Sequence, residues 1–287
     1  MVLNISSIVP RIPVSEGVTD AVRWITDTFS FLFNPIKQHF GNLMEFISET
    51  VLMNIPPFVF ILLIAVIAFF ITGKKLGLAA FSIVGLWFVY NQGYWDQMMN
   101  TITLVIVASL LSIIIGVPVG ILMSKSKIAE TIITPILDFM QTMPAFVYLI
   151  PAVAFFGIGM VPGVIASLIF ATPPTVRFTN LGIRQVSAEL VEAADAFGST
   201  GSQKLFKVEL PMARPTIMAG INQTVMLSLS MVVIASMIGA PGLGREVLSA
   251  LQRSQVGPGF VSGVGIVILA IVIDRMTQNL SKEKKSS

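Results

Sequence analysis

The chain contains no cysteine, a single histidine and few charged side chains. The absence of cysteine excludes disulfides, thiolate metal sites and a cysteine nucleophile. Because His39 stands alone, no histidine cluster is available to hold a metal, and we expect no metal site in this chain. Charged residues make up 11% of the sequence, whereas a soluble globular domain carries about 25%. The chain therefore has too little charge to cover a water-facing surface.

Long apolar segments take the place of the missing charge. Hydrophobic residues make up 54% of the chain, and a helix that crosses a membrane needs roughly 20 apolar residues to cover about 30 Å of hydrocarbon. We therefore predict an all-α integral membrane protein with about seven transmembrane helices. The predicted spans are residues 56–72, 76–91, 100–124, 133–156, 160–177, 215–239 and 258–274. The segment GIGMVPG separates the fourth span from the fifth, because its glycines and proline permit a turn.

The residues before the first span have a different character. Residues 1–19 contain two prolines and a glycine and are expected to be irregular. Apolar side chains then recur every three or four residues from Val22 to Phe40, which predicts an N-terminal amphipathic helix that Pro35 kinks or divides. Such a helix either lies on the membrane surface or packs on the rest of the protein. The sequence leaves both interpretations open.

The polar segment 178–214 is much longer than the few residues that a bare connection needs. Its sequence SAELVEAADAFG predicts a helix with Ser187 as the N-cap, which Gly198 ends or bends. A second short helix is expected through SQKLFKVEL, and Pro211 either ends it or begins the next span. One face of the first helix would carry Leu190, Ala193, Ala194 and Phe197. Such a projection suits docking into another protein, and a helix lying flat under the bilayer is the alternative.

Lysine and arginine indicate the orientation, because they are enriched in the cytoplasmic loops of membrane proteins. If the polar segment is cytoplasmic, 13 of the 18 Lys and Arg residues lie inside and 5 lie outside. The outer five are Arg11, Arg23, Lys37, Arg245 and Arg253. The sequence therefore predicts an N-terminus outside the cell and a cytoplasmic C-terminus.

The polar segment also carries an ordered pattern. Glu192-Ala193-Ala194 is followed by three residues, Gly198, nine residues, Val208, one residue and Leu210-Pro211. This resembles the EAA loop of permease subunits in ATP-binding-cassette importers, EAA-x3-G-x9-I-x-LP, with valine in place of the usual isoleucine. The resemblance implies a loop that docks on a separate ATPase subunit. Its coupling residues would be Glu192, Ala193, Ala194, Phe197, Gly198, Val208, Leu210 and Pro211.

The resemblance extends over about residues 95–275. ILDFMQTMPAFVYLIPAVAFFGIG, PGVIASLIFATPPTVRFTNLGI and MLSLSMVVIASMIGAPGLG are similar to the permease of glycine betaine/proline osmoprotectant importers. This implies a type I importer-like permease core in a bacterial cell (inner) membrane, without enzyme activity, for glycine betaine or a related quaternary ammonium osmoprotectant. The implied partners are a second copy of the permease, two ATP-binding subunits that hold the ATP and Mg, an extracytoplasmic substrate-binding protein or domain, and the lipid bilayer, with no nucleic acid.

These features divide the chain into four parts. We predict an extracytoplasmic or interfacial amphipathic segment, 1–55, and two accessory transmembrane helices, 56–97. The permease core, 98–278, contains the coupling loop, and a basic cytoplasmic tail, 279–287, follows it.

Other functions fit the sequence less well. Ion-coupled secondary carriers bury acids in their spans, and only Asp138 falls inside a span here. The chain has no G-x-x-x-x-G-K-[ST] phosphate loop, and GAPGLG at 239–244 is expected to be a turn. A related importer for an amino acid or a sulfonate is the nearer alternative.

Three smaller groups of residues invite structural tests. Gly116 and Gly120 are spaced for a close helix contact, and Tyr90, Tyr94 and Trp95 are expected together at the outer interface. Met140, Met143, Phe146 and Tyr148 either line a path for a quaternary ammonium or belong to the core. The substrate-binding residues stay unassigned.

Overall fold

A computed structural model describes residues 13–281, and this range is helical throughout, with no β-strand. Its elements are α1 (Val14–Thr28), α2 (Ser30–Glu45), the π-helical η2 (Phe46–Leu52), α3 (Pro57–Ile71), α4 (Leu76–Asn91), α5 (Trp95–Lys125), α6 (Lys127–Thr142), the 3-10 turn η3 (Ala145–Tyr148), α7 (Leu149–Phe156), α8 (Met160–Arg184), α9 (Ala188–Ala196), α10 (Gly201–Lys204), the π-helical η4 (Leu205–Glu209), α11 (Leu210–Ser236), α12 (Leu243–Gln252) and α13 (Val256–Ser281).

Most of the apolar helices lie where the sequence predicts spans. Four helices are long and apolar enough to cross a membrane by themselves: α5, α8, the continuous run Gly201–Ser236, and α13. Two bent pairs pass the same test together, namely Ser30–Leu52 with α3, and α6 with Ala145–Phe156. The remaining predicted span coincides with α4, a shorter apolar helix. The prediction of an all-α, multi-pass membrane protein is therefore confirmed.

The centre of the bundle is the packing of α8 against α5 and α11. A Cβ on Gly116 would lie 2.8 Å from Thr175 Cγ2, and one on Gly120 would lie 2.6 Å from the Val176 carbonyl oxygen. Both glycines therefore let α5 approach the backbone of α8, as their spacing predicts. Thr175 also contacts α11, because its hydroxyl lies 2.7 Å from that of Thr224.

The predicted single span 133–156 is wrong in shape. Two helices, α6 and the run Ala145–Phe156, meet there at 109°. The bend lies at Met143, which is extended with φ −71° and ψ 133°, as residues before proline tend to be. Pro144 also has no N–H to continue the hydrogen bonding of α6. The turn predicted after this span is present, and Gly157 and Gly159 adopt φ values of 79° and 127° there.

The N-terminal segment differs from the sequence prediction in two ways. Helix α1 already begins at Val14, directly after Pro13, so the expected irregular structure is wrong for residues 14–19, and residues 1–12 lie outside the described range. The division falls at Phe29 (φ −102°, ψ 18°), whereas Pro35 lies inside α2. The ring of Phe33 stacks on that of Phe155 with 5.0 Å between centroids, so α2 packs on the core, while α1 has no buried residue.

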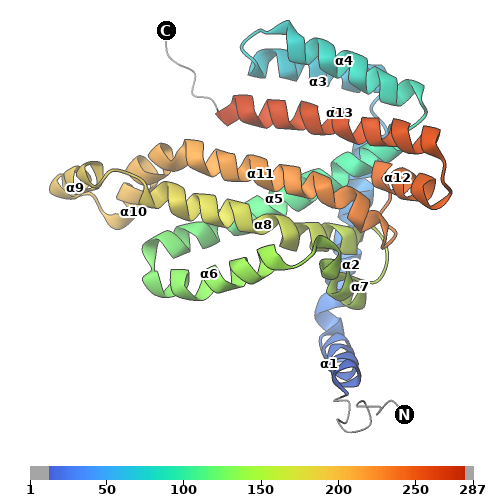
Figure 1. The fold of residues 1–287 in the computed structure, drawn as a ribbon. Coiled ribbons are helices and arrows are strands. Elements are labelled where there is room, and N and C mark those ends of the chain that lie inside the picture. The colour runs from blue at the N-terminus through green and yellow to red at the C-terminus, as the bar shows by residue number, and fades with distance from the viewer. Residues whose placement is uncertain (1–12, 282–287) are drawn as a thin grey trace, which may run out of the picture.

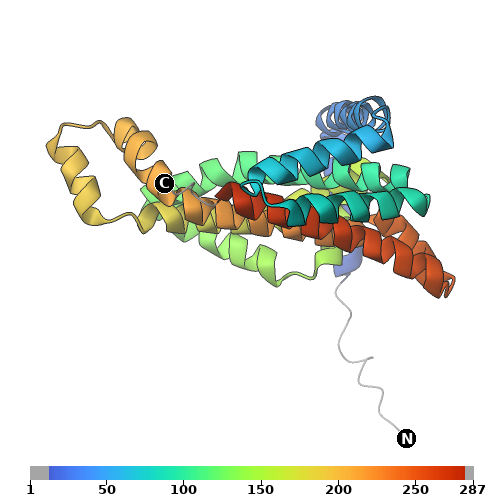
Figure 2. The same cartoon turned by 90° about the horizontal axis from the view of Figure 1, so that it is seen from above.

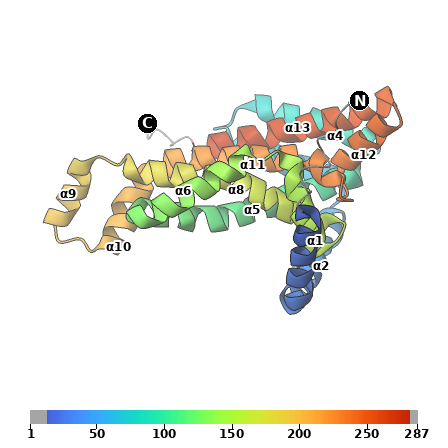
Figure 3. The same cartoon turned by 60° about the horizontal axis from the view of Figure 1, so that its bottom comes forward.

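The long helices run side by side, and the two ends of this bundle differ (Figure 1). At one end, here named the loop end, α9 and α10 project beyond all other helices, and the described chain also ends near it. At the other, the strap end, α1, α2 and η2 form a strap that crosses the bundle, so that α1 and α2 are seen nearly end-on in Figure 2. Figure 3 shows the strap reaching out past the bundle on one side.

Two further features lie at the strap end. Tyr90 and Trp95 are together, with ring centroids 5.8 Å apart, but Trp95 is only 7% exposed and packs edge-on against Phe60. Trp95 is therefore a core residue, which does not fit an anchor in the membrane interface. The predicted turn at GAPGLG is present, with φ values of 85° at Gly239 and 128° at Gly242, and it leads into α12, which the sequence analysis missed.

Candidate functional site

The polar loop at the loop end folds into the elements that its sequence predicts. Ser187 caps α9, and its side chain accepts a hydrogen bond from the Leu190 N–H. Thr200 and Gln203 form a capping box at the start of α10, in which each side chain accepts from the backbone N–H of the other residue. Pro211 stands in the first turn of α11, so it begins the span and does not end the preceding helix.

Gly198 connects α9 to α10 and adopts φ +72°, a conformation that glycine enters without steric cost. A Cβ there would meet no atom within 4 Å, so the requirement for glycine comes from the backbone angle and not from lack of space. Across the turn, Lys204 Nζ lies 2.8 Å from both carboxylate oxygens of Asp195 and joins α10 to α9. The two short helices therefore form one hairpin whose shape is fixed locally.

The apolar side chains of α9 point away from the chain. Phe197 is 90% exposed and Leu190 is exposed as well, whereas Ala194 turns inward and is buried. The main contacts of α9 are with α10 and η4, and in all three views it stands clear of the long helices (Figures 1–3). The described part of the chain therefore leaves this apolar tip uncovered.

Predicted coupling residues divide into two groups in the structure. Glu192, Ala193, Phe197 and Gly198 lie exposed at the projecting tip, with the buried Ala194 beneath them. Val208 and Leu210 are half-buried where the loop joins α11, beside the exposed Pro211. The first group forms the tip of the loop, and the second forms the base that connects it to α11.

The base of the loop is held by a residue that the sequence analysis did not assign. Glu209 ends the π-helical turn η4, is 4% exposed, and forms an ion pair with Lys125, the last residue of α5. A π-helical turn inside a longer helix is often found at functional sites. The only sequence signal for Glu209 was its charge between the apolar Val208 and Leu210.

Two more ion pairs tie α6 to α8 toward the same end. Arg184 Nη2 lies 2.7 Å from Glu130 Oε2 and 3.2 Å from the Met123 carbonyl oxygen, so it links α8 to both α6 and α5. Asp138, the one acid predicted inside a span, is paired with Arg177. The pairing gives Asp138 a role in helix packing.

Three of the residues considered for a quaternary ammonium path lie close together, because Met143 packs against the cluster that contains Tyr148, which is hydrogen-bonded to Met140. Tyr148 is buried, and its hydroxyl donates a hydrogen bond to the Met140 carbonyl oxygen. Phe146, two residues earlier, is exposed. Tyr148 therefore belongs to the packing around the bend that follows α6.

Comparisons with known proteins agree with this geometry. Residues 112–286 match the family described as binding-protein-dependent transport system inner membrane component. The glycine betaine/carnitine transport permease protein GbuB of Listeria monocytogenes (serotype 1/2a, strain 10403S) is 57% identical over 97% of this chain and 99% of its own length. The glycine betaine transport system permease protein OpuAB of Bacillus subtilis (strain 168) is 51% identical over 96% of this chain and 97% of its own length.

A solved structure shares the fold. The MetNI methionine ABC transporter in an inward-facing conformation has a chain that superposes with a TM-score of 0.59 at 22% identity, over 63% of this chain and 91% of its own. At this identity the likeness concerns the fold. The family match, which begins within α5 and includes the polar loop, is supported by relatives that align with nearly the whole chain. The chain therefore belongs to the inner membrane components of binding-protein-dependent transport systems, as a multi-pass permease with the fold of ABC importer permeases.

Proposed function

We propose that this chain is the permease subunit of an ATP-driven importer for glycine betaine or a related quaternary ammonium osmoprotectant. The observation that carries the substrate class is the similarity, at 57% and 51% identity over nearly the whole chain, to relatives named as glycine betaine transport permeases. An importer for an amino acid or a sulfonate is the rival assignment, because the fold alone also suits it.

The exposed hairpin α9–α10 supports a coupling role. We assign docking on an ATP-binding subunit to Leu190 on α9 and Phe197 at its C-cap, because both apolar side chains are exposed. The ATP and Mg belong to that partner, and two such subunits would serve two copies of this permease. An extracytoplasmic binding protein or domain completes the proposed assembly.

The distribution of charge supports an orientation. In the proposed topology the loop end faces the cytoplasm and carries 13 of the 18 Lys and Arg residues of the chain, as the positive-inside rule requires. The strap end then faces outward. The predicted basic tail is part of this count, although residues 282–287 lie outside the described range.

The test is uptake of labelled glycine betaine into liposomes that contain this chain with its ATPase and binding protein. We expect uptake that requires ATP and is blocked by excess unlabelled glycine betaine. ATP-dependent uptake of an amino acid or a sulfonate alone would refute the substrate assignment. Uptake driven by an ion gradient without ATP would refute the coupling role of the loop.

A further inference from the structure

A pocket of about 320 Å³ lies at the strap end, between the strap and the ends of three core helices. One face of α2 and η2 lines it at helical spacing, through Lys37, Gly41, Met44, Glu45, Ser48 and Glu49. The opposite wall comes from the start of α5, the turn between α7 and α8, and the turn between α11 and α12. Small-molecule sites in proteins measure about 300–1,000 Å³, so the pocket is large enough for a small solute.

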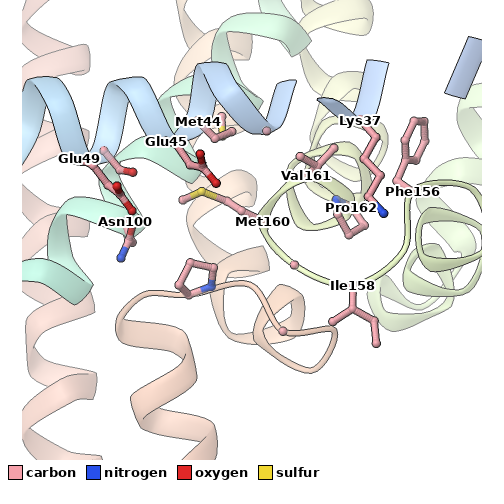
Figure 4. A pocket seen from close by; sticks show the side chains of 15 residues that line it. Lys37, Met44, Glu45, Glu49, Asn100, Phe156, Ile158, Met160, Val161 and Pro162 are labelled. Carbon is pink, nitrogen blue, oxygen red and sulfur yellow. The ribbon is translucent and has the colours of Figure 1, made fainter. Parts of the chain in front are cut away.

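Charges of opposite sign stand at opposite sides of this pocket. Figure 4 shows Glu45, Glu49 and Asn100 on one side, and Lys37 with Phe156 on the other. Eight residues of helix separate Lys37 from Glu45, which corresponds to about 12 Å along the axis. Both side chains are exposed and border the pocket, so it presents charges of opposite sign to a small solute.

None of these charges is neutralised within the described part of the chain. Residues 13–281 contain four ion pairs, and none includes Lys37, Glu45 or Glu49. The three charged side chains are exposed, and Ser48, which also lines the pocket, is 3% exposed. The three charges are therefore open to a solute that enters the pocket.

The wall beside Lys37 also favours a negative group. A Cβ added to Gly157 would lie 3.0 Å from Lys37 Nζ. The ammonium group therefore lies against the turn that leads into α8. The first turn of α8, from Met160, lines the same pocket. The N-terminus of a helix carries a partial positive charge that stabilises anions, so it adds to the effect of the lysine.

We propose that this pocket, hereafter the strap pocket, binds the transported zwitterion at the outer face of the permease. The trimethylammonium group lies between Glu45 and Glu49, and the carboxylate faces Lys37 and the start of α8. The proposal rests on the proposed function for its solute and its orientation. It adds a binding site on the permease itself, at the point where the ends of α5, α8 and α11 meet.

The absence of cysteine makes the strap pocket testable by labelling. A Cβ on Gly41 would find its nearest neighbour, Val161 Cγ2, at 3.9 Å, so Gly41→Cys fits without displacing the wall. Gly17→Cys on α1 is the matched control, since nothing lies within 4 Å of it. Both variants are prepared as the full permease with its ATPase, without binding protein, and treated with a thiol-reactive methanethiosulfonate.

Glycine betaine is the probe. At about four times its Kd it occupies about 80% of the sites, so we expect modification of Gly41→Cys to slow about fivefold and that of Gly17→Cys to stay unchanged. Tetramethylammonium and 3,3-dimethylbutanoate each carry one of the two charges and should protect much less. Equal protection by either analogue, or none by glycine betaine, would overturn the proposal.

Charge-removing variants in the Gly41→Cys background complete the test. Lys37→Met, and Glu45→Gln together with Glu49→Gln, should abolish protection, whereas Asp20→Asn, on the exposed α1, should preserve it. Protection that survives the pocket variants would refute the assigned contacts. Uptake of glycine betaine without protection would overturn the strap pocket alone, whereas uptake of a different solute only would overturn both proposals.

Discussion

The two ends of the bundle differ in whether their charged side chains form ion pairs. The four ion pairs of residues 13–281 all lie at the loop end or in the half of the bundle next to it. Two of them join α6 to α8, one joins α5 to η4, and one joins α9 to α10. At the strap end, Lys37, Glu45 and Glu49 face a pocket with no ion pair among the described residues.

This difference separates two tasks. Charges that are paired within the chain hold helices in fixed positions, which a loop needs if it is to pass a movement from a partner to the spans. Charges left open in a pocket are available to a ligand, because no internal partner has to be displaced first. Under the two proposals, the hairpin α9–α10 with its base at η4 is a rigid handle for the ATPase subunit, and the strap end is a binding site.

The largest effect on the handle is expected from Gly198→Val, which changes the turn between α9 and α10. A β-branched residue at φ +72° carries backbone strain of about 1–3 kcal/mol, so we expect the hairpin to change shape. Substrate-stimulated ATP hydrolysis of the assembled complex should fall to less than about one-tenth of wild type. The matched control is Gly201→Val, since Gly201 also has no atom within 4 Å of a Cβ but has an ordinary φ. Full stimulation in the Gly198 variant would contradict a fixed hairpin.

Phe197→Ala tests the tip of the handle. Because 90% of Phe197 is exposed, its removal should leave the Tm of the isolated permease unchanged. Buried aromatic anchors contribute about 2 kcal/mol or more to an interface, so the Kd for the ATPase subunit should rise at least about thirtyfold. The same substitution at Phe260, which is exposed on α13 at the strap end, is the control. An unchanged Kd would place the docking surface elsewhere on the loop.

Glu209→Gln tests the base of the handle. Removing one partner of a buried pair costs about 3–5 kcal/mol, but the Lys125 side chain is 39% exposed, and solvent screening reduces this to about 1–2 kcal/mol. The Tm of the permease in detergent should therefore fall by about 2–8 °C. The double variant Lys125→Met/Glu209→Met should recover most of the loss, because it leaves no unpaired charge. A double variant as unstable as the single one would mean that the pair does not account for the effect.

Much of the loop end could be predicted because its signals are local. The N-cap Ser187, the turn at Gly198 and the return helix depend on residues within a few positions of each other, and the sequence placed all three correctly. The pairing of Glu209 with Lys125 joins residues 84 positions apart. No periodic pattern or spacing links such residues before the chain has folded.

The strap end was harder to predict because its pocket is formed by residues that are far apart in the sequence. Glu45 and Glu49 lie beyond the helix that the apolar period predicts from Val22 to Phe40. Only the crossing of α2 and η2 over the core brings them, with Lys37, into one pocket wall. The bend at Met143 was missed because the apolar run continues through Pro144, so hydropathy alone reports one span. The short helix α12 was missed because its amphipathic stretch lies between two clear spans and adds no span of its own.

The smallest expected effect comes from the pair between Asp195 and Lys204. The carboxylate side chain is 52% exposed, and exposed pairs contribute about 0.2–1 kcal/mol, so Asp195→Asn should speed amide hydrogen exchange in α9 and α10 by only about twofold to fivefold. The increase should disappear at about 1 M salt, where the Debye length is about 3 Å. An increase of tenfold or more, independent of salt, would mean that this pair and not Gly198 with its flanking caps fixes the hairpin. A small, screened effect would instead show that backbone geometry sets the shape of the handle, and that its ion pair only adjusts it.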